Sequence, residues 1–373
     1  MKIALLLSRI EQTGVTTHTL DLAKGLVDMG HEICLITGGK IVDATSRVDD
    51  FYNEFVSLGI TIKEFPTPNG SVFNKVIQSI TSVQKVMKDI KAFDPDVIHS
   101  QSPYMTFIPW LMGKKFTTTI HILYLKRNFK FKNPDHLIAI SQESFEFSKK
   151  VFGMKKENIS LIHHGVSDRF ATPITDSEKL KLKSKLNINP EKLIIGFAGS
   201  ISLRKGSDIL VEALKNLEPS TKEKIHFIFL GGVVGSEDHN WLLKMISDAG
   251  IGSFITTVPF EDPKPFYDIF DVFILPSRME SFPLVTIEAM MSNCCPIRSN
   301  TEGAYEQIED GVNGILFDNE SVAGCTSSLE KIINNPELRL RLANNAKEKA
   351  LKEFTIPVMT KNTLKVYDKI RLK

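Results

Sequence analysis

The sequence has few cysteines and no long apolar run. Its four cysteines form no Cys-x-x-Cys pair, and Cys294 and Cys295 are adjacent in the chain. Neither a disulfide framework nor a zinc site fits this spacing, and free thiols are typical of a reducing compartment. No stretch approaches the roughly 18 apolar residues of a membrane span, and the run 3–7 is too short for a signal peptide. We therefore expect a cytoplasmic protein.

The chain also lacks a strong net charge and low-complexity segments. Lys and Arg number 46 against 44 Asp and Glu, so the formal net charge of +2 gives no reason to expect nucleic acid binding. Hydrophobic residues make up 42% and charged residues 24%, as in soluble globular enzymes with well-buried cores. A length of 373 residues predicts about two domains.

One region is nevertheless basic. Residues 110–160 contain ten basic residues against four acidic ones. Such a run is either a solvated surface or a band that meets an anionic acceptor or anionic lipid headgroups, at about 1 kcal/mol per basic group. The second reading predicts peripheral contact with the inner face of a membrane through residues 114–156. The ten basic residues are Lys114, Lys115, Lys126, Arg127, Lys130, Lys132, Lys149, Lys150, Lys155 and Lys156.

Strand-like apolar runs alternate with helical spacing, and this pattern occurs twice. A strand, a loop with Gly14, a helix ending at Gly30 and a second strand form a βαβ unit, which requires a parallel sheet. After a polar stretch at 171–192, a linker candidate, the pattern restarts. The predicted strands are 3–7, 33–36, 97–99, 118–122, 137–140, 159–162, 193–198, 227–230, 255–258 and 272–275.

The repetition predicts an α/β protein of two Rossmann-like domains that face a central cleft. We place the first at 1–170 and the second at 171–354. A C-terminal helix at about 355–373 is expected to pack back on the first domain. Ligands of such sheets bind at the carboxyl ends of strands, so the loops after strands carry the candidate sites.

The most informative segment is 275–288, with the sequence LPSRMESFPLVTIE. A helix is predicted to start near Pro283, and a helix start offers free N–H groups to an anion. Glu280 precedes that start and Glu288 follows it, so a carboxylate lies on each side of a phosphate-binding position. Alternatively, these are ordinary acidic residues favoured by the helix dipole.

The run PSRMESFPLVTIEAMMSNCCPI (276–297), followed by GAYEQIEDGVNGILF (303–317), resembles the E-x7-E region of retaining, family 4-type glycosyltransferases of the GT-B fold. Glu280 and Glu288 match the two glutamates. Further counterparts follow in order along nearly the whole chain. They are the loop at Gly14, PDVIH (95–99), TTTIH (117–121), AISQES (139–144), HHGVSDRF (163–170) and GFAGSISLRKG (196–206).

The resemblance implies a transfer of a sugar, with retention, from a nucleotide donor that is a co-substrate rather than a cofactor. It assigns Glu288 to the ribose, Glu280 to the donor sugar and Lys205 to the diphosphate. It makes the domain 1–170 the acceptor side and the domain 171–354 the nucleotide-sugar-binding side, and it places His121 near the transferred sugar. His121, Lys205 and Glu280 are the expected catalytic residues. The expected donor-binding residues are Gly14, Arg204, Lys205, Ser281, Phe282, Leu284 and Glu288.

The chain departs from the family pattern at the first loop of the second domain. Ser200 follows Gly199 where the family usually has Arg, and we expect Arg204 beside Lys205 to supply the missing charge. The segment His164-Gly165-Val166-Ser167 stands where the family usually has Asn-Gly-Val-Asp. Glu302 precedes Gly303 at a place where two glycines are common.

Two other motifs are expected to be structural. His99 is a core histidine on this reading. Asp94-Pro95-Asp96 forms a D-x-D, but it directly precedes a strand and is expected to be a turn, so no metal is predicted.

The sequence therefore predicts a hexosyltransferase-type enzyme with a nucleotide-sugar donor, expected to be UDP-linked. Its acceptor would be a glycan or a lipid-linked glycan in cell-surface polysaccharide, lipopolysaccharide or glycolipid assembly. A sugar-nucleotide epimerase with the same fold and a catalytically weak nucleotide-binding module are the alternatives.

Overall fold

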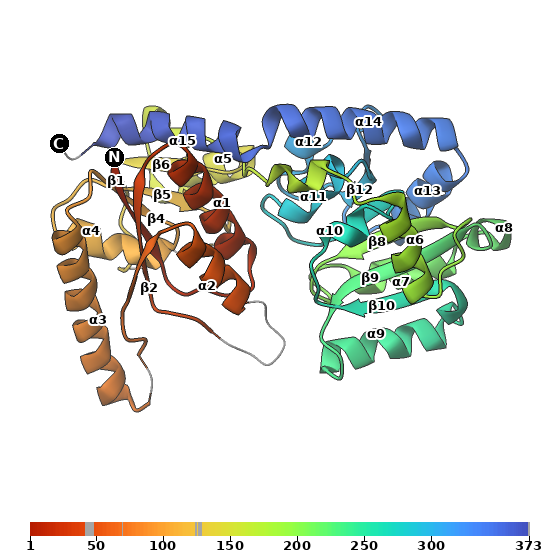
Figure 1. Cartoon of the computed structure of the whole chain (residues 1–373), viewed down its shortest axis with the longest axis horizontal. Helices are drawn as coiled ribbons and strands as arrows, with labels where there is room; N and C mark the ends of the chain where they lie inside the picture. Colours follow the sequence, from red (N-terminus) through yellow and green to blue (C-terminus); the bar gives the residue numbers. More distant parts are fainter. Residues whose placement is uncertain (42–47, 69, 124, 126–128, 372–373) are drawn as a thin grey trace. The chain divides into compact units, whose positions relative to one another are not determined.

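The computed structural model describes residues 1–41, 48–68, 70–123, 125 and 129–371 (Figure 1). The chain divides into two compact units. The first comprises Met1–Gly165 with Ile356–Lys373, and the second comprises Val166–Thr355. Each unit consists of a parallel sheet with its own covering helices.

The sheet of the first unit has seven strands in the order β3-β2-β1-β4-β5-β6-β7, and its described pairings are parallel. The strands are β1 (Lys2–Leu7), β2 (Glu32–Thr37), β3 (Thr61–Glu64), β4 (Val97–Ser100), β5 (Thr117–Ile120), β6 (His136–Ala139) and β7 (Ile159–Leu161). The helices are α1 (Gly14–Asp28), α2 (Val48–Ser57), α3 (Val72–Phe93), η1 (Pro103–Thr106), α4 (Phe107–Leu111), α5 (Gln142–Phe152), η2 (Lys156–Asn158) and α15 (Ile356–Ile370).

The sheet of the second unit has six strands in the order β10-β9-β8-β11-β12-β13, again with parallel pairings among the described residues. The strands are β8 (Leu193–Ala198), β9 (Ile225–Gly232), β10 (Ile255–Pro259), β11 (Val272–Leu275), β12 (Cys295–Ser299) and β13 (Ile315–Phe317). The helices are η3 (Asp168–Ala171), α6 (Asp176–Lys185), α7 (Ser207–Lys215), α8 (Pro219–Lys222), α9 (Glu237–Asp248), η4 (Gly252–Phe254), α10 (Lys264–Tyr267), α11 (Leu284–Met291), α12 (Ala304–Gln307), α13 (Val322–Ile333) and α14 (Pro336–Glu353).

All ten predicted strands exist. Three further strands, β3, β12 and β13, were not predicted from the sequence. A strand buried on both faces requires a continuous apolar run, which β1 and β11 have. In contrast, β3 is largely exposed and reads Thr-Ile-Lys-Glu. β12 contains a proline and an arginine, and β13 is only three residues long.

The polar stretch predicted as a linker, 171–192, contains a helix instead. α6 begins with a capping box in which Thr175 accepts from the Glu178 N–H and the Glu178 carboxylate accepts from the Thr175 N–H. None of its residues is buried, so the helix lacks the apolar stripe by which a sequence indicates a helix.

The boundary between the units lies slightly before the predicted residue 170. The Val166 N–H donates to the Phe354 carbonyl at 2.8 Å, and Val166 forms a β-bridge with Thr355. Phe170 packs its ring edge-on against Tyr267, with centroids 5.8 Å apart. These contacts assign residues 166–170 to the second unit.

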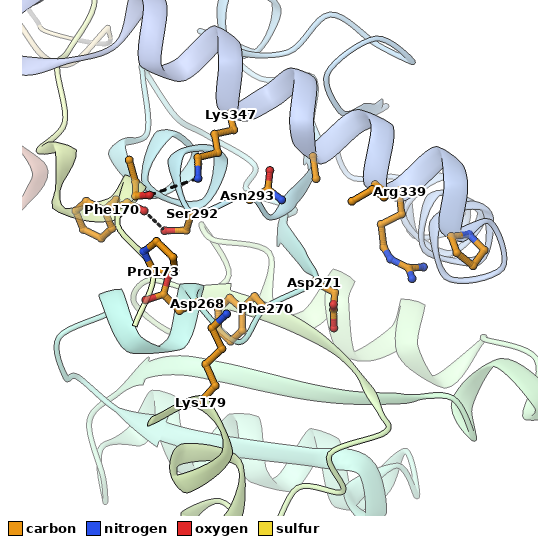
Figure 2. A pocket seen from close by; sticks show the side chains of 14 residues that line it. Phe170, Pro173, Lys179, Asp268, Phe270, Asp271, Ser292, Asn293, Arg339 and Lys347 are labelled. Carbon is orange, nitrogen blue, oxygen red and sulfur yellow. Dashed lines mark hydrogen bonds between the residues drawn. The ribbon is translucent and has the colours of Figure 1, made fainter. Parts of the chain in front are cut away.

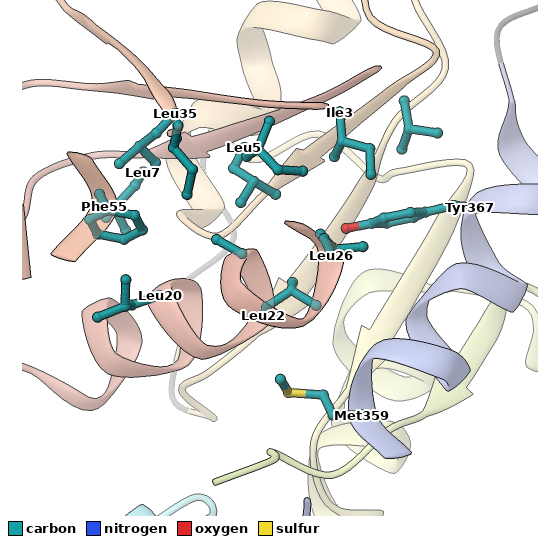
Figure 3. Packing of buried hydrophobic residues seen from close by; sticks show 14 of the residues in the cluster. Ile3, Leu5, Leu7, Leu20, Leu22, Leu26, Leu35, Phe55, Met359 and Tyr367 are labelled. Atoms are coloured by element: carbon teal, nitrogen blue, oxygen red, sulfur yellow. The ribbon is translucent and has the colours of Figure 1, made fainter. Parts of the chain in front are cut away.

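The last helix, α15, packs on α1 in the core of the first unit (Figure 3). Met359 and Tyr367 from α15 join Leu22 and Leu26 of α1 in one buried cluster beneath β1. Gly25 lets the helices approach closely, because a Cβ there would lie 2.1 Å from Thr360 Oγ1.

This close approach predicts that Gly25→Ala lowers the melting temperature. Alanine normally stabilises a helix by about 1 kcal/mol relative to glycine, but overpacking at this contact costs roughly 1–3 kcal/mol. We expect a net fall of a few degrees in differential scanning calorimetry. Gly252→Ala is the matched control, because its nearest contact would be 3.8 Å away. The double variant Gly25→Ala/Thr360→Ala should regain part of the loss, and a stabilised Gly25→Ala protein would contradict the packing.

Candidate active site

The second sheet reverses its strand order between β8 and β11, and the functional side chains follow these two strands. From β8 the sheet continues to β9 and β10, and from β11 it continues to β12 and β13. In open parallel sheets, ligands bind outside the carboxyl ends of the strands at such a switch point. The loops in question are residues 199–206 after β8 and 276–283 after β11.

The two loops contact each other directly. The Arg278 N–H donates to the Arg204 carbonyl at 2.9 Å, and the Arg204 guanidinium donates to the Met279 carbonyl at 3.3 Å. Gly206 has φ +73°, and a Cβ there would lie 2.0 Å from the Pro276 carbonyl oxygen. Only glycine therefore allows this approach of the loops.

An ion pair between Lys205 and Glu280 joins the loops where they meet. Lys205 Nζ lies 2.5 Å from Glu280 Oε1, and the two side chains are only 13% and 8% exposed. Burial raises the pKa of Glu280, but the charge of Lys205 and its hydrogen bond outweigh that effect, so the pKa lies below its usual value. Two of the predicted catalytic residues, Lys205 and Glu280, are thus in contact. Arg204, on the same loop as Lys205, is exposed.

The N-terminus of α11 lies directly after this ion pair in the chain. Helix α11 begins at Leu284, as predicted, with Pro283 as N-cap and no side-chain capping bond. The backbone at Gly303, in the turn after β12, packs closely against Ser281. A Cβ on Gly303 would lie only 2.3 Å from the Ser281 carbonyl oxygen. Phe282 is buried. An uncapped helix N-terminus held in this way offers N–H groups to an anion.

Glu288 lies in the second turn of α11 and has a different environment from Glu280. It is 8% exposed, and the Tyr267 hydroxyl donates to its Oε2 at 3.0 Å. Burial raises the pKa of Glu288 to about 7, although the Tyr267 hydrogen bond and the charge of Arg169 act in the opposite direction. Two glutamates eight positions apart therefore differ in their protonation near neutral pH.

The first unit places a histidine cluster at the carboxyl edge of its own sheet. His121 directly follows β5, and His18 lies in α1, whose first residue is Gly14. His164 Nε2 lies 3.3 Å from His121 Nδ1, while His121 Nε2 bonds the Gln101 side-chain oxygen at 2.9 Å. The amide oxygen can only accept, so His121 carries its proton on Nε2. Burial keeps the pKa of His18 and His121 well below the usual value.

This cluster is the set of side chains in the described part of the chain that comes closest to a metal site. One ligand atom from each of His18, His121 and His164 lies within 4.8 Å of the others. Zinc–nitrogen bonds of about 2.0–2.1 Å place tetrahedral ligands roughly 3.3 Å apart. The His121–His164 separation of 3.3 Å matches that spacing, whereas the three ligand atoms together span up to 4.8 Å. The rings of His18 and His164 are partly stacked, with centroids 4.3 Å apart. The cluster would have to contract to hold zinc.

Two motifs are structural, as predicted. His99 is fully buried and bonds Tyr367 and Thr119, each at 2.8 Å. In the D-x-D, Asp94 ends α3 with a left-handed backbone, and the Asp96 carboxylate accepts from the Lys2 N–H at 2.8 Å. This turn connects α3 to β4.

Family models cover both units. The model described as Glycosyltransferase Family 4 matches residues 12–170, and the model described as Glycosyl transferases group 1 matches residues 178–349. The chain is a glycosyltransferase of the family 4 type. The predicted family is thereby confirmed.

Curated relatives are distant but consistent with this family. The chain is 26% identical over 227 residues to a D-inositol 3-phosphate glycosyltransferase of Stackebrandtia nassauensis, a match covering 58% of this chain and 50% of the relative. It is 27% identical over 67% of its length to N,N'-diacetylbacillosaminyl-diphospho-undecaprenol alpha-1,3-N-acetylgalactosaminyltransferase of Campylobacter jejuni, of which 64% is covered. The chain thus spans about half the length of the first of these relatives.

Solved structures confirm the GT-B fold. HepE from Anabaena, crystallised in complex with UDP-glucose, is 18% identical with a TM-score of 0.83, and the match covers 99% of this chain and all of HepE. At that identity, the likeness establishes the fold and no more. The predicted α/β architecture of two Rossmann-like units is therefore correct.

Three functional side chains escaped the sequence analysis. Tyr267 bonds Glu288, His18 joins the histidine cluster, and Arg298 is a fully buried arginine in β12. Only Arg298 left a signal, since it is a lone charge following the apolar residues Cys294–Ile297. The partners of the other two become adjacent only in the folded chain.

The second unit also contains a cavity of about 520 Å³, but this cavity is not the candidate site (Figure 2). Its walls include Asp271, Asn293, Arg339 and Lys347. Asp271 precedes β11 and Asn293 precedes β12, so the cavity opens at the amino ends of these strands. The Lys205–Glu280 pair lies at the opposite edge of the sheet.

The raised pKa of Glu288 predicts a specific pH dependence of stability. A carboxyl group with a folded pKa of about 7 binds more protons folded than unfolded, so its stabilisation is complete below the unfolded pKa and is lost as pH rises toward 7. Glu288→Gln should therefore be more stable than the wild type at pH 8, by up to about 3 kcal/mol, and should gain little at pH 4.5. Urea unfolding at both pH values measures this, with the exposed Glu353→Gln as control. Equal gains in stability for both variants at pH 8 would contradict the inference that burial raises the pKa of Glu288.

Proposed function

We propose that the enzyme transfers a hexose from a UDP-sugar, with retention, to a glycan or lipid-linked acceptor in cell-surface polysaccharide or glycolipid assembly. The observation that carries the proposal is the buried Lys205–Glu280 pair, directly before the uncapped N-terminus of α11. HepE, crystallised with UDP-glucose, supports the choice of donor. The Campylobacter jejuni relative, named for a diphospho-undecaprenol-linked acceptor, supports the acceptor class.

In this proposal, the donor diphosphate binds at the N-terminus of α11. The N–H groups near Phe282 and Leu284 and the helix dipole attract the phosphates, whereas Pro283 has no N–H to donate. Lys205 turns from Glu280 toward the diphosphate. As the bond to the anomeric carbon lengthens, negative charge grows on the leaving phosphate, and a fixed cation stabilises that state more than the bound donor. Ser281 completes the donor site of the second unit, and Gly14 of the first unit stays a predicted donor-binding residue.

The two glutamates then hold opposite ends of the donor. Glu280, freed from Lys205, accepts from hydroxyls of the transferred sugar. Glu288 accepts from the ribose hydroxyls, and Tyr267 fixes the orientation of its carboxyl group through the bond to Oε2. His121 of the first unit stays the residue predicted near the transferred sugar, and in this structure its Nε2–H donates to Gln101. Because Lys205 supplies the charge at the phosphate, the transfer requires no metal.

A transfer assay with a panel of nucleotide sugars tests the proposal, with NMR of the product reporting the anomeric configuration. Lys205→Ala should lose about 10²–10³ in turnover, the usual cost of removing one electrostatic donor. Arg204→Ala should lose at least about tenfold, near 1.4 kcal/mol, if Arg204 shares the role. Lys215→Ala, an exposed lysine of α7, is the control. Chelation with EDTA should leave the wild-type rate unchanged.

Other outcomes favour the alternatives. An inverted product would contradict retention, and an epimerised donor would indicate the isomerase. Nucleotide binding without turnover would indicate a binding module. A rate lost with EDTA and restored by zinc would assign the histidine cluster to a metal.

We further propose that the first unit contacts anionic membranes. Exposed Trp110 of α4 lies beside Lys132, whose Nζ is 4.2 Å from the ring centroid. Lys114 and Lys115 follow in the chain and are exposed, as are Val76 and Ile80 of the neighbouring α3. Lys126 and Arg127 of the predicted band lie outside the described residues. No described helix has the length and apolarity to cross a bilayer, so the proposed contact is at the surface.

Liposome flotation tests this contact. Lys114→Glu/Lys115→Glu should lower partitioning onto vesicles with anionic lipid more than tenfold, since each basic group near the surface contributes about 1 kcal/mol. Lys215→Glu/Lys224→Glu, on the second unit, is the matched control. High salt should release the wild type. Equal recovery with neutral vesicles would mean that the band is only a solvated surface.

A further inference from the structure

Arg298 is an arginine with no exposed surface, at the end of a strand beside the candidate site. It lies in β12 and is paired in register with Leu275, the last residue of β11. The loop carrying Glu280 begins at the next residue, so the Arg298 guanidinium is buried at the carboxyl edge of the sheet. A buried charge is costly unless hydrogen bonds compensate for it.

The guanidinium binds the turn that follows β12. Nη2 donates to Thr301 Oγ1 at 2.9 Å and to the Glu302 carbonyl at 3.1 Å, and Nη1 donates to Gln307 Oε1 at 2.5 Å. Both Thr301 and Gln307 are buried. The planar fork of arginine suits three such acceptors, and an ammonium group could not reach them together.

Through these partners Arg298 acts on the N-terminus of α11. The Gln307 amide donates to the Pro283 carbonyl at 3.0 Å, and Pro283 is the residue directly before α11. The turn that Arg298 binds carries Gly303, which packs against the Ser281 carbonyl. One guanidinium therefore holds both segments that flank the proposed phosphate position.

Arg298 also affects Glu280 by its charge. Its positive charge helps to keep the pKa of Glu280 low, although Lys205 contributes more. When Lys205 turns to the diphosphate, Glu280 loses its ion-pair partner, whereas Arg298 stays in place because its hydrogen bonds are within the fold.

We propose that Arg298 is a positioning residue for the donor site, which holds the Thr301–Ala304 turn and the start of α11 in place while Lys205 binds the diphosphate. The inference rests on the proposed function, because it assumes that the diphosphate binds at α11. Arg298 is then a second cation at the site. It is fully buried in β12, whereas Lys205 lies in the loop after β8.

Two variants test the positioning and the charge: the first removes the positioning alone, and the second removes both. Arg298→Lys keeps the charge but loses the fork, so the KM for the donor should rise about tenfold while the acid limb of the kcat–pH profile stays in place. Arg298→Met/Gln307→Met replaces the buried polar pair by apolar side chains, which preserves folding. Its acid limb should move to higher pH, because Glu280 then protonates more readily. A merely structural role would not move that limb.

Arg339→Met is the matched control. Arg339 also donates to backbone carbonyls, those of Ile332 and Ile333, but it lies at the amino edge of the sheet. It should leave both the KM and the acid limb unchanged. A double variant with wild-type KM and an unmoved acid limb would overturn the proposal.

Hydrogen exchange of the free protein distinguishes this failure from failure of the proposed function. In the double variant, peptides covering 281–285 and 301–307 should exchange faster, and in Arg339→Met they should not. If the wild type neither binds UDP nor transfers sugar, the proposed function fails. If hydrogen exchange of these peptides is unchanged in the double variant, the positioning role is overturned, and this result needs no donor.

Discussion

Parallel strand pairing is the constraint on which the rest of the structure depends. Adjacent parallel strands cannot be joined by a tight turn, so each connection crosses a face of the sheet as a helix and buries both faces. In both units the strand order reverses once, between β1 and β4 and between β8 and β11. At each reversal, two loops leave the sheet side by side in opposite directions. The fold thereby creates a place for a ligand before any side chain is considered.

At the second of these places, two buried glutamates are stabilised in different ways. Glu280 has a lysine partner and a lowered pKa, whereas Glu288 has a neutral tyrosine hydroxyl and a raised one. Burial raises the pKa of both; the charge of Lys205 outweighs this effect for Glu280, whereas the Tyr267 hydroxyl does not outweigh it for Glu288. A carboxylate with a movable cationic partner suits a charge that changes during a reaction. A carboxyl group fixed by a hydroxyl suits a hydrogen-bonded ligand that stays in place.

The buried histidines of the first unit take hydrogen-bond partners from distant parts of the chain. His121 bonds Gln101 and His164, and His99 bonds Thr119 and Tyr367. Tyr367 comes from α15, the last helix, so the end of the chain supplies a partner to the centre of the first sheet. This arrangement makes the C-terminal helix part of the first unit's core and not an appendage to it.

The sequence by itself determined the strands that are buried on both faces, because only continuous apolar runs can form them. It also determined the helix start at Pro283 and the spacing of Glu280 and Glu288, which are local properties of the chain. Edge and irregular strands such as β3 and β12 were not predictable, because their pairing depends on neighbours that the local pattern does not reveal. The linker prediction missed α6 because a helix with no buried residue has no apolar stripe. Only the tertiary structure decided that Lys205 faces Glu280, that Tyr267 bonds Glu288 and that Arg298 binds Gln307. The partners in the Lys205–Glu280 and Tyr267–Glu288 contacts are far apart in the chain. The buried guanidinium of Arg298 selects its acceptors by geometry, which no sequence pattern encodes.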